Sequence, residues 1–299
     1  MKKIYMAGCG GMLGEAFYKV FSQDYEVKCS DIDSNEKWLS YCDFRDFEMY
    51  KNDVMAYKPD YLFHIGAFTD LEFCELHPEE TYITNEKSVE HAVKISNSLK
   101  IPVLYISTAG IFDGSKDVYD DFDIPAPLCQ YAKTKYAGEK YVENNANSFL
   151  IFRAGWMMGG GPKKDKKFIH KIMSQIKSGQ KELFIVNDKF GTPTYTHDFA
   201  ENVLLVIESG KRGLYNLVCE GLTSRLDVAK KIISIIGLTD KVIINQVSSK
   251  YFAKEYFAKR PHSERLINKK LSDARLNIMR PWEVAIEEYL TQYYDNYLV

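Results

Sequence analysis

The sequence predicts an α/β fold: a doubly wound parallel sheet with a smaller, mixed α/β lobe on its C-terminal side. Short apolar runs alternate with helical stretches through the first half of the chain, as in a parallel sheet covered on both faces. A glycine run with the spacing G-x-x-G-x-x-G directly follows the first apolar run. The alternation ends after Arg153, where glycines and lysines become frequent. We expect one unit over residues 1–154 and a second mainly over 155–299, interleaved with the first.

The first unit contains five candidate strands separated by helices. The strands are expected at Lys3–Ala7, Glu26–Ser30, Tyr61–Ile65, Val103–Ser107 and Phe149–Phe152. The helices are expected at Met12–Phe21, Phe47–Tyr57, Thr81–Leu99 and Tyr131–Asn144. Right-handed crossovers make such strands parallel, and ligands then bind beyond their carboxyl ends.

The second half follows a different pattern. Gly155, Gly159–Gly161 and Pro162 precede the dense basic stretch Lys163–Lys167, and together they predict a mobile, solvated loop. Helices are expected at Phe168–Ser178, Thr196–Glu208, Arg225–Ile236 and Trp282–Tyr293. Strands are expected between them at Leu183–Val186, Gly213–Val218 and Val242–Val247.

The glycines Gly8, Gly11 and Gly14 predict a dinucleotide site. They join the strand Lys3–Ala7 to the helix that follows it. Gly8 permits a sharp turn, Gly11 lets the backbone approach a pyrophosphate, and Gly14 lets helix and strand pack closely. The free N–H groups at the start of the helix favour an anion there. We therefore interpret residues 1–154 as a dinucleotide-binding domain.

An acidic residue should follow about 20 residues later, where its carboxylate accepts hydrogen bonds from the adenine ribose. Asp31 directly follows the second strand, with Asp33 close behind. A carboxylate there repels a 2′-phosphate, so the sequence slightly favours NAD(H) over NADP(H). Arg45 would soften that preference.

Composition limits the remaining possibilities. The chain of 299 residues has a formal net charge of −2, which argues against a nucleic-acid surface. Its six cysteines are scattered without zinc or disulfide spacing, and no cluster of metal ligands is evident. We see neither a signal peptide nor an apolar run long enough to span a membrane. A reducing cytoplasm is the expected compartment.

Tyr131 and Lys135 are the predicted acid–base pair. Four residues apart on one helix, they lie on the same face, where the ammonium can stabilise a phenolate and lower its pKa. The lysine can also bind the nicotinamide ribose. Tyr136 and Lys140 have the same spacing, but they begin about 140° further around the helix. We choose Tyr131 because it lies at the helix start nearest the strand ends.

A hydroxyl is expected beside this pair. Ser107 and Thr108 end the fourth predicted strand, where either hydroxyl could bind a substrate oxygen and stabilise its developing charge. Either could instead bond the backbone at the strand end. With the dinucleotide loop, this set predicts hydride transfer to or from a carbonyl.

These residues resemble the extended short-chain dehydrogenase/reductase superfamily, whose cofactor domain is a Rossmann fold. More narrowly, they resemble the sugar-nucleotide-binding dTDP-4-dehydrorhamnose reductase family, over nearly the whole chain. The motifs that carry this likeness are S-T-A-G-I-F-D-G from Ser107, Y-A-K-T-K-Y-A-G-E-K from Tyr131, F-R-A-G-W from Phe152, N-D-K-F-G-T-P-T from Asn187 and R-P-H-S-E-R-L from Arg260.

The resemblance implies roles for particular residues. It makes Thr108, Tyr131 and Lys135 catalytic, and it adds Trp156 and Arg260, beside Thr108 and Tyr131, as contacts to a sugar nucleotide. Implied cofactor contacts are Gly8, Gly11, Met12, Leu13, Asp31, Asp43, Phe44, Gly66, Ala67, Phe68 and Lys135. It implies NAD(P)H-dependent reduction of a keto group on a nucleotide-linked deoxysugar, used for example in polysaccharide biosynthesis.

Two departures from the family pattern affect specificity. Ala109 and Gly110 stand where the family usually has Asp and Tyr, and Glu264 stands where it usually has Ser. The residues for hydride and proton transfer are therefore retained while the expected sugar contacts are altered. We expect a related keto-deoxysugar nucleotide as substrate.

Other functions with the same residues stay open. An epimerase or dehydratase would hold NAD tightly and return the hydride to the sugar. A non-catalytic regulatory subunit, similar to the beta subunit of methionine adenosyltransferase, is a third possibility. Some relatives use Mg²⁺ at a dimer contact, but no ligand set for it is assigned here, and a homodimer is plausible from the superfamily.

Overall fold

The computed structural model describes residues 1–34 and 36–298. Its centre is a sheet of seven parallel strands in the order β12-β7-β5-β4-β1-β2-β3. The strands are β1 (Lys3–Ala7), β2 (Glu26–Asp31), β3 (Leu39–Tyr41), β4 (Tyr61–His64), β5 (Val103–Thr108), β7 (Phe149–Ala154) and β12 (Gly213–Leu217). The predicted doubly wound α/β fold is confirmed, with the short edge strand β3 as an addition.

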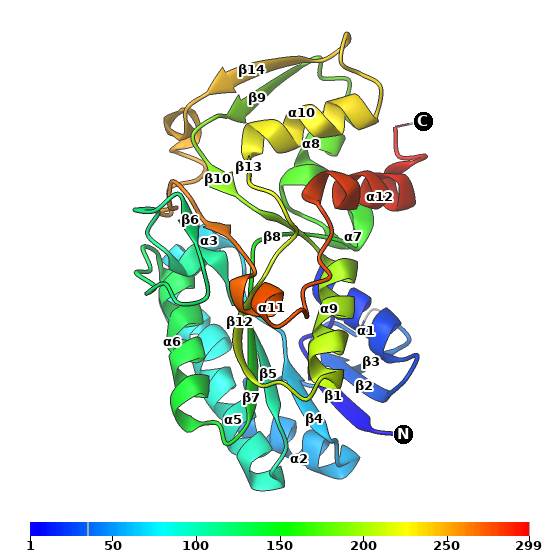
Figure 1. The fold of residues 1–299 in the computed structure, drawn as a ribbon, viewed down its shortest axis with the longest axis vertical. Helices are drawn as coiled ribbons and strands as arrows, with labels where there is room; N and C mark the ends of the chain where they lie inside the picture. Colours follow the sequence, from blue (N-terminus) through cyan, green and yellow to red (C-terminus); the bar gives the residue numbers. More distant parts are fainter. Residues whose placement is uncertain (35, 299) are drawn as a thin grey trace.

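Helices cover both faces of this sheet (Figure 1). They are α1 (Met12–Phe21), α2 (Phe47–Tyr57), α3 (Leu71–Leu76), α4 (Pro78–Tyr82), α5 (Ser88–Leu99), α6 (Gln130–Asn145) and α9 (Thr196–Glu208). Alternation along β1 explains the two faces: Met6 packs with α1 and α9, whereas Tyr5 packs with α2 and α5. The helix predicted at Thr81–Leu99 is interrupted by a π-helical turn, Ile83–Lys87.

The upper lobe in Figure 1 contains several small two-stranded sheets rather than one large one. The parallel pairs are β8 (Trp156–Met158) with β11 (Pro193–Tyr195), β9 (Glu182–Val186) with β14 (Ile243–Val247), and β6 (Val118–Tyr119) with β15 (Arg265–Leu266). The antiparallel pair is β10 (Phe190–Gly191) with β13 (Thr223–Ser224). The larger helices of this part are α8 (Phe168–Lys177), α10 (Arg225–Ile235) and α12 (Trp282–Tyr294), and the shorter ones are α7 (Gly161–Lys164) and α11 (Lys269–Asp273).

The chain crosses between the two parts more than once. Strand β12 and helix α9 lie after residue 155, yet they complete the large sheet and one of its helical layers. Phe199 of α9 stacks on Phe17 of α1, with ring centres 6.1 Å apart. Residues after 155 therefore contribute a strand and a helix to the part of the fold that residues 1–154 mainly form.

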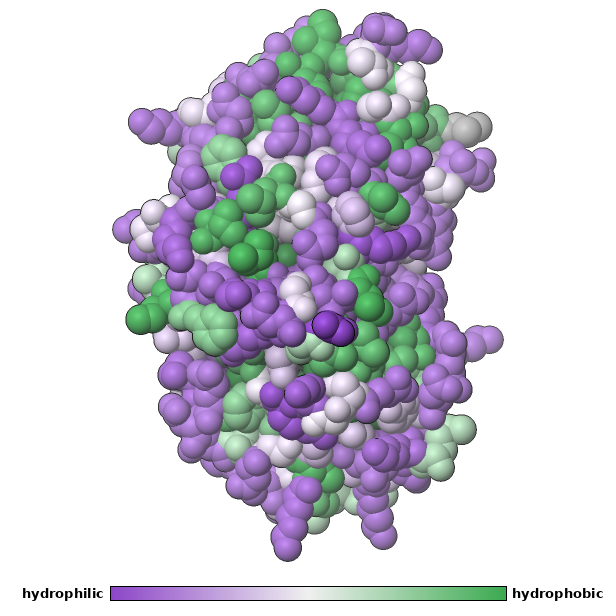
Figure 2. Space-filling view, in the orientation of Figure 1, coloured by the Kyte–Doolittle hydropathy of each residue, from purple (hydrophilic) through white to green (hydrophobic). Residues whose placement is uncertain are grey.

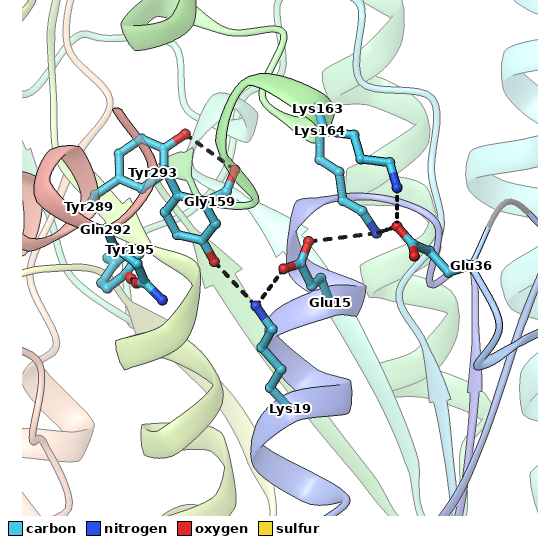
Figure 3. Close-up of polar contacts among 10 residues, drawn as sticks. All are labelled: Glu15, Lys19, Glu36, Gly159, Lys163, Lys164, Tyr195, Tyr289, Gln292 and Tyr293. Atoms are coloured by element: carbon cyan, nitrogen blue, oxygen red, sulfur yellow. Dashed lines mark hydrogen bonds and ion pairs between the residues drawn. The ribbon is translucent and has the colours of Figure 1, made fainter. Parts of the chain in front are cut away.

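The basic stretch Lys163–Lys167 is not the free, solvated loop that we expected. Figure 3 shows Lys163 and Lys164 reaching the carboxylates of Glu15 and Glu36. Lys163 Nζ lies 2.5 Å from Glu36, and Lys164 Nζ lies 3.7 Å from both acids. These ion pairs link α7 to the first turn of α1 and to the segment after β2. The acidic partners precede the lysines by more than a hundred residues in the sequence, so nothing in the sequence indicated the pairing.

Hydrophilic residues cover most of the face drawn in Figure 2, and apolar residues form small separate groups there. Among residues 1–34 and 36–298, no helix is both long and apolar enough to cross a membrane.

Candidate active site

The glycine turn after β1 leaves room for a ligand at one position only. Gly8 has a positive φ of 84°, and a Cβ on it would lie 2.2 Å from Gly66 Cα. A Cβ on Gly14 would lie 2.1 Å from the carbonyl oxygen of Cys9, so α1 packs directly on the turn. A Cβ on Gly11, by contrast, would meet nothing within 4 Å. The space over Gly11 at the start of α1 therefore fits the pyrophosphate of a dinucleotide.

Asp31 lies at the end of β2, directly beside this turn. Its carboxylate accepts hydrogen bonds from the backbone N–H of Gly10 at 2.7 Å and of Asp33 at 3.1 Å. These bonds fix the carboxylate next to the glycine turn, the position that suits an adenine ribose. The preference for NAD(H) over NADP(H) stays a prediction.

The segment after β3 completes this side of the cradle. The Arg45 guanidinium donates several hydrogen bonds to the Asp43 carboxylate, and Arg45 Nη2 lies 2.7 Å from Asp43 Oδ2. This pairing lowers the pKa of Asp43. The Phe44 ring lies against Gly66, where an added Cβ would be only 2.5 Å from it. Arg45 is therefore held by Asp43 rather than pointing freely toward a 2′-phosphate.

The loop after β4 is fixed by a residue that the sequence did not reveal. The Asn85 side chain accepts from the Phe68 N–H at 2.8 Å and donates to the Phe68 carbonyl at 3.0 Å. Asn85 is buried in the π-helical turn. No periodicity announces such a turn, and an asparagine inside a predicted helix gave no signal of its role.

Thr108 and Ser107 behave differently at the end of β5. Thr108 is partly exposed, and its Oγ1 accepts from the Gly110 N–H at 3.1 Å. Ser107 is buried, and its hydroxyl has no hydrogen-bond partner within the described residues. Of these two hydroxyl residues, Thr108 is the more accessible to a ligand, and its catalytic role stays a prediction.

Helix α6 brings Tyr131 to Thr108. Burial raises the pKa of Tyr131 above its ordinary value, the neighbouring Thr108 hydroxyl opposes that rise, and the Glu264 carboxylate contributes to it. Lys135 lies one turn further on and is 3% exposed, and burial lowers its pKa to about 7. Its Nζ lies 4.2 Å from the centre of the Tyr105 ring. Burial thus disfavours the charged form of both groups, the phenolate of Tyr131 and the ammonium of Lys135.

The second Tyr–Lys pair lies elsewhere on α6. Tyr136 packs against the apolar cluster that includes Phe112 and Tyr119. Lys140 is exposed and pairs with Glu143 at 3.0 Å. The structure thus gives this pair a packing role and a surface role.

The upper lobe contributes the other wall of the site. Trp156 donates its Nε1–H to a carboxylate oxygen of Glu264, and the Arg225 guanidinium stacks 3.6 Å from the centre of the indole ring. Burial lowers the pKa of Arg225 to about 10. The sequence did not single out Arg225, because one arginine at a helix start carries no distinctive motif.

Arg260, which the resemblance made a substrate contact, is engaged with another residue. Its two terminal nitrogens each lie 2.7 Å from an oxygen of Glu72 on α3. A ligand would have to compete with this ion pair, whereas no hydrogen-bond acceptor contacts the Arg225 guanidinium within the described part of the chain. Nor do three His, Cys, Asp or Glu side chains gather closely enough there to hold a metal ion.

Comparisons with known proteins agree with this fold. The model of the family described as "RmlD substrate binding domain" matches residues 1–295. The spore coat polysaccharide biosynthesis protein SpsK of Bacillus subtilis (strain 168) is 28% identical over 294 residues, which covers 98% of each chain.

Two solved structures cover 98% of this chain and 100% of their own. The dTDP-4-dehydrorhamnose reductase of Yersinia enterocolitica is 30% identical, with a TM-score of 0.88. The same reductase of Bacillus anthracis str. Ames, solved in complex with NADP, is 26% identical, with a TM-score of 0.88. The chain belongs to the RmlD family, as its resemblance to the dTDP-4-dehydrorhamnose reductases predicted.

Proposed function

We propose that this protein is an NAD(P)H-dependent oxidoreductase that reduces a keto group on a nucleotide-linked deoxysugar. The proposal rests on Thr108 and Tyr131, which interact where β5 ends and α6 begins, with Lys135 one turn further along α6 and the glycine turn at the same edge of the sheet. A dinucleotide cradle and an acid–base set at one sheet edge are what a carbonyl reductase needs. The reductases of Yersinia enterocolitica and Bacillus anthracis support the same chemistry.

The cofactor would be held by backbone and side chains at four strand ends and by one side chain of α6. The proposed contacts are Gly8, Gly11, Met12 and Leu13 after β1, Asp31 after β2, Asp43 and Phe44 after β3, Gly66, Ala67 and Phe68 after β4, and Lys135 on α6. The bound cofactor would supply the hydride. The fit rests on the open space at Gly11 and on the close packing at Gly8 and Gly14.

The protein's own groups would handle the proton. As the carbonyl oxygen gains negative charge, Thr108 Oγ1 donates a hydrogen bond to it, and Tyr131 Oη gives it a proton. The resulting phenolate at Tyr131 is stabilised by the Lys135 ammonium one helical turn away. Burial disfavours the Tyr131 phenolate and the Lys135 ammonium when each is alone. Because the two charges are opposite, the presence of one would favour formation of the other.

The nucleotide part of the substrate would bind across the upper lobe. Trp156 offers a ring face and Arg225 a cation stacked on it, which together suit a sugar and a diphosphate. Arg260 would add a second cation once Glu72 releases it. The retained proton machinery and the altered sugar contacts at Gly110 and Glu264 support a deoxysugar related to, but distinct from, dehydrorhamnose.

The test is NADH and NADPH oxidation, followed by absorbance, against a panel of nucleotide-linked 4-keto-6-deoxysugars. We expect turnover with one member, and Tyr131→Phe should reduce it by roughly 10²- to 10⁴-fold while cofactor binding is kept. Tyr136→Phe is the matched control, because the same change is made one helical face away.

Other outcomes would identify the alternatives. Bound NAD after purification, with turnover that needs no added cofactor, would indicate an epimerase or dehydratase. Cofactor binding without any turnover, and copurification with a synthetase, would indicate a regulatory subunit.

We also propose a cytoplasmic homodimer. All six cysteines are free and buried, which suits a reducing compartment. The dimer rests on the superfamily resemblance. Light scattering would then give twice the chain mass of 34.5 kDa, and the monomer mass would contradict it.

A further inference from the structure

The two departures from the family pattern, Gly110 and Glu264, lie side by side although 154 residues separate them in the sequence. A Cβ built on Gly110 would stand 3.5 Å from Thr108 Oγ1 and 3.7 Å from Glu264 Oε2. The glycine therefore leaves a space that is bounded on one side by the proposed catalytic hydroxyl and on the other by a carboxylate oxygen.

The Glu264 carboxylate is held in place by the upper lobe. Its backbone N–H donates to the Phe190 carbonyl at 2.9 Å, just before β15 begins. Its Oε1 accepts a hydrogen bond from the Trp156 indole N–H, and the Arg225 guanidinium lies over the face of that ring. The Glu264 side chain is thus oriented by one hydrogen bond from Trp156, whose ring Arg225 packs on, and its backbone is held by Phe190, as a recognition group requires.

The second oxygen is available. Within the described residues, Oε2 accepts no hydrogen bond, and the Glu264 carboxylate interacts electrostatically with Arg225, Lys189, Tyr131 and Cys129. The Lys189 ammonium is already used, because it donates to the carbonyls of Arg260 and Pro261 at 3.0 Å each. A ligand hydroxyl that enters the space over Gly110 would find Oε2 as its acceptor.

We propose that Glu264 is a specificity-determining residue, whose Oε2 accepts a hydrogen bond from a sugar hydroxyl on the carbon next to the carbonyl that Thr108 binds. The proposal rests on the function proposed above. Thr108 Oγ1 and Glu264 Oε2 both lie within 4 Å of one point, so a single pyranose ring can reach both oxygens. A substrate without that hydroxyl would leave Oε2 of a partly buried carboxylate without a donor, which is the costly case.

The inference is tested by comparing two ligands on two proteins. Binding of dTDP-6-deoxyhexose and of its 3-deoxy counterpart is measured by calorimetry on the wild type and on Glu264→Ala, each loaded with NADP⁺. We expect the wild type to prefer the hydroxylated sugar by ~10- to 100-fold, the range for a hydrogen bond to a charged acceptor. In the variant, affinity for the hydroxylated sugar should fall until the ratio is near one, with little change for the 3-deoxy sugar.

Controls separate recognition from support of Trp156. If Glu264 only positions the indole ring, both sugars lose affinity equally in Glu264→Ala, and the inference is overturned. Glu264→Gln keeps an oxygen that accepts from Trp156 but replaces the charged acceptor by an amide N–H donor, so it should weaken the preference without losing affinity for the 3-deoxy sugar. Glu255→Ala, at an exposed acid in the same segment, should leave the ratio unchanged.

Binding also distinguishes this inference from the proposed function. Selective binding with no turnover of any keto sugar would contradict the reductase but uphold the role of Glu264. Turnover of a keto sugar, with no change of sugar preference in Glu264→Ala, would uphold the reductase but contradict the role of Glu264. A wild type that binds neither sugar would overturn the inference.

Discussion

Lys135 should make the protein less stable while serving its proposed chemistry. Burial lowers the pKa of this lysine from 10.5 to about 7 in the folded chain. Between those two pH values the unfolded chain binds more protons, so the free energy of unfolding rises with pH across the window. Below pH 7 both states are charged, and the whole cost of burying the ammonium is present. The pKa difference of about 3.5 corresponds to about 5 kcal/mol at 1.36 kcal/mol for each pKa unit.

Lys135→Met removes the charge and keeps a flexible side chain of similar length. At about pH 6 we expect the variant to unfold several kcal/mol less readily than the wild type, and this advantage should shrink to near zero as the pH approaches 10.5. Its reductase activity should be lost, because nothing then stabilises the Tyr131 phenolate. Urea unfolding over that pH range measures the first effect, and NADH oxidation the second.

Lys133→Met is the matched control, since Lys133 is exposed on the same helix. Its free energy of unfolding should change by less than about 0.5 kcal/mol at every pH. The reasoning is refuted if Lys135→Met is no more stable than the wild type at about pH 6. It is refuted equally if the gain does not depend on pH.

Four further substitutions test the glycine turn, the loop after β4 and the buried ion pair. Gly11→Ala should keep the thermal midpoint but weaken NADPH binding in a fluorescence titration, because the new methyl group enters the open space. Gly8→Ala should instead lower the thermal midpoint, because its Cβ would clash with Gly66. A lower midpoint for Gly11→Ala than for Gly8→Ala would contradict the roles assigned to the two glycines. Asn85→Ala should weaken NADPH binding by about tenfold through loss of two bonds to the Phe68 backbone; unchanged affinity would remove Asn85 from the site. Glu139→Gln should lower the free energy of unfolding in urea by about 3–5 kcal/mol, because it leaves the buried guanidinium of Arg153 without a countercharge, and an unchanged midpoint would show that the pair is dispensable.

The cofactor half of the molecule could be predicted because its signals are local. A strand, a glycine turn and an amphipathic helix are each defined by neighbours in sequence, so β1, the glycine run and α1 appear where they were expected. Edge strand β3 was missed, since three residues between loops carry no usable periodicity. The Lys163–Lys167 segment was misjudged because its acidic partners, Glu15 and Glu36, are distant in the sequence.

The proposed substrate-binding residues were also harder to predict from the sequence, because their partners are distant in the chain. The sequence marks Gly110 and Glu264 as unusual, but only the fold shows that one leaves the space that the other borders. Likewise, the chain offers several arginines, and only the tertiary contacts show that Glu72 engages Arg260 while Arg225 stacks on Trp156.

The sequence alone therefore determined the fold class, the dinucleotide turn and the Tyr131–Lys135 spacing, because strand alternation and helical periodicity place those groups through short-range geometry. Tertiary structure decided which side chains are buried, which ions are paired and which distant segments meet. Burial and long-range pairing set the pKa of Lys135 and the position of the Glu264 carboxylate, and neither is a property of the residues nearby in the chain.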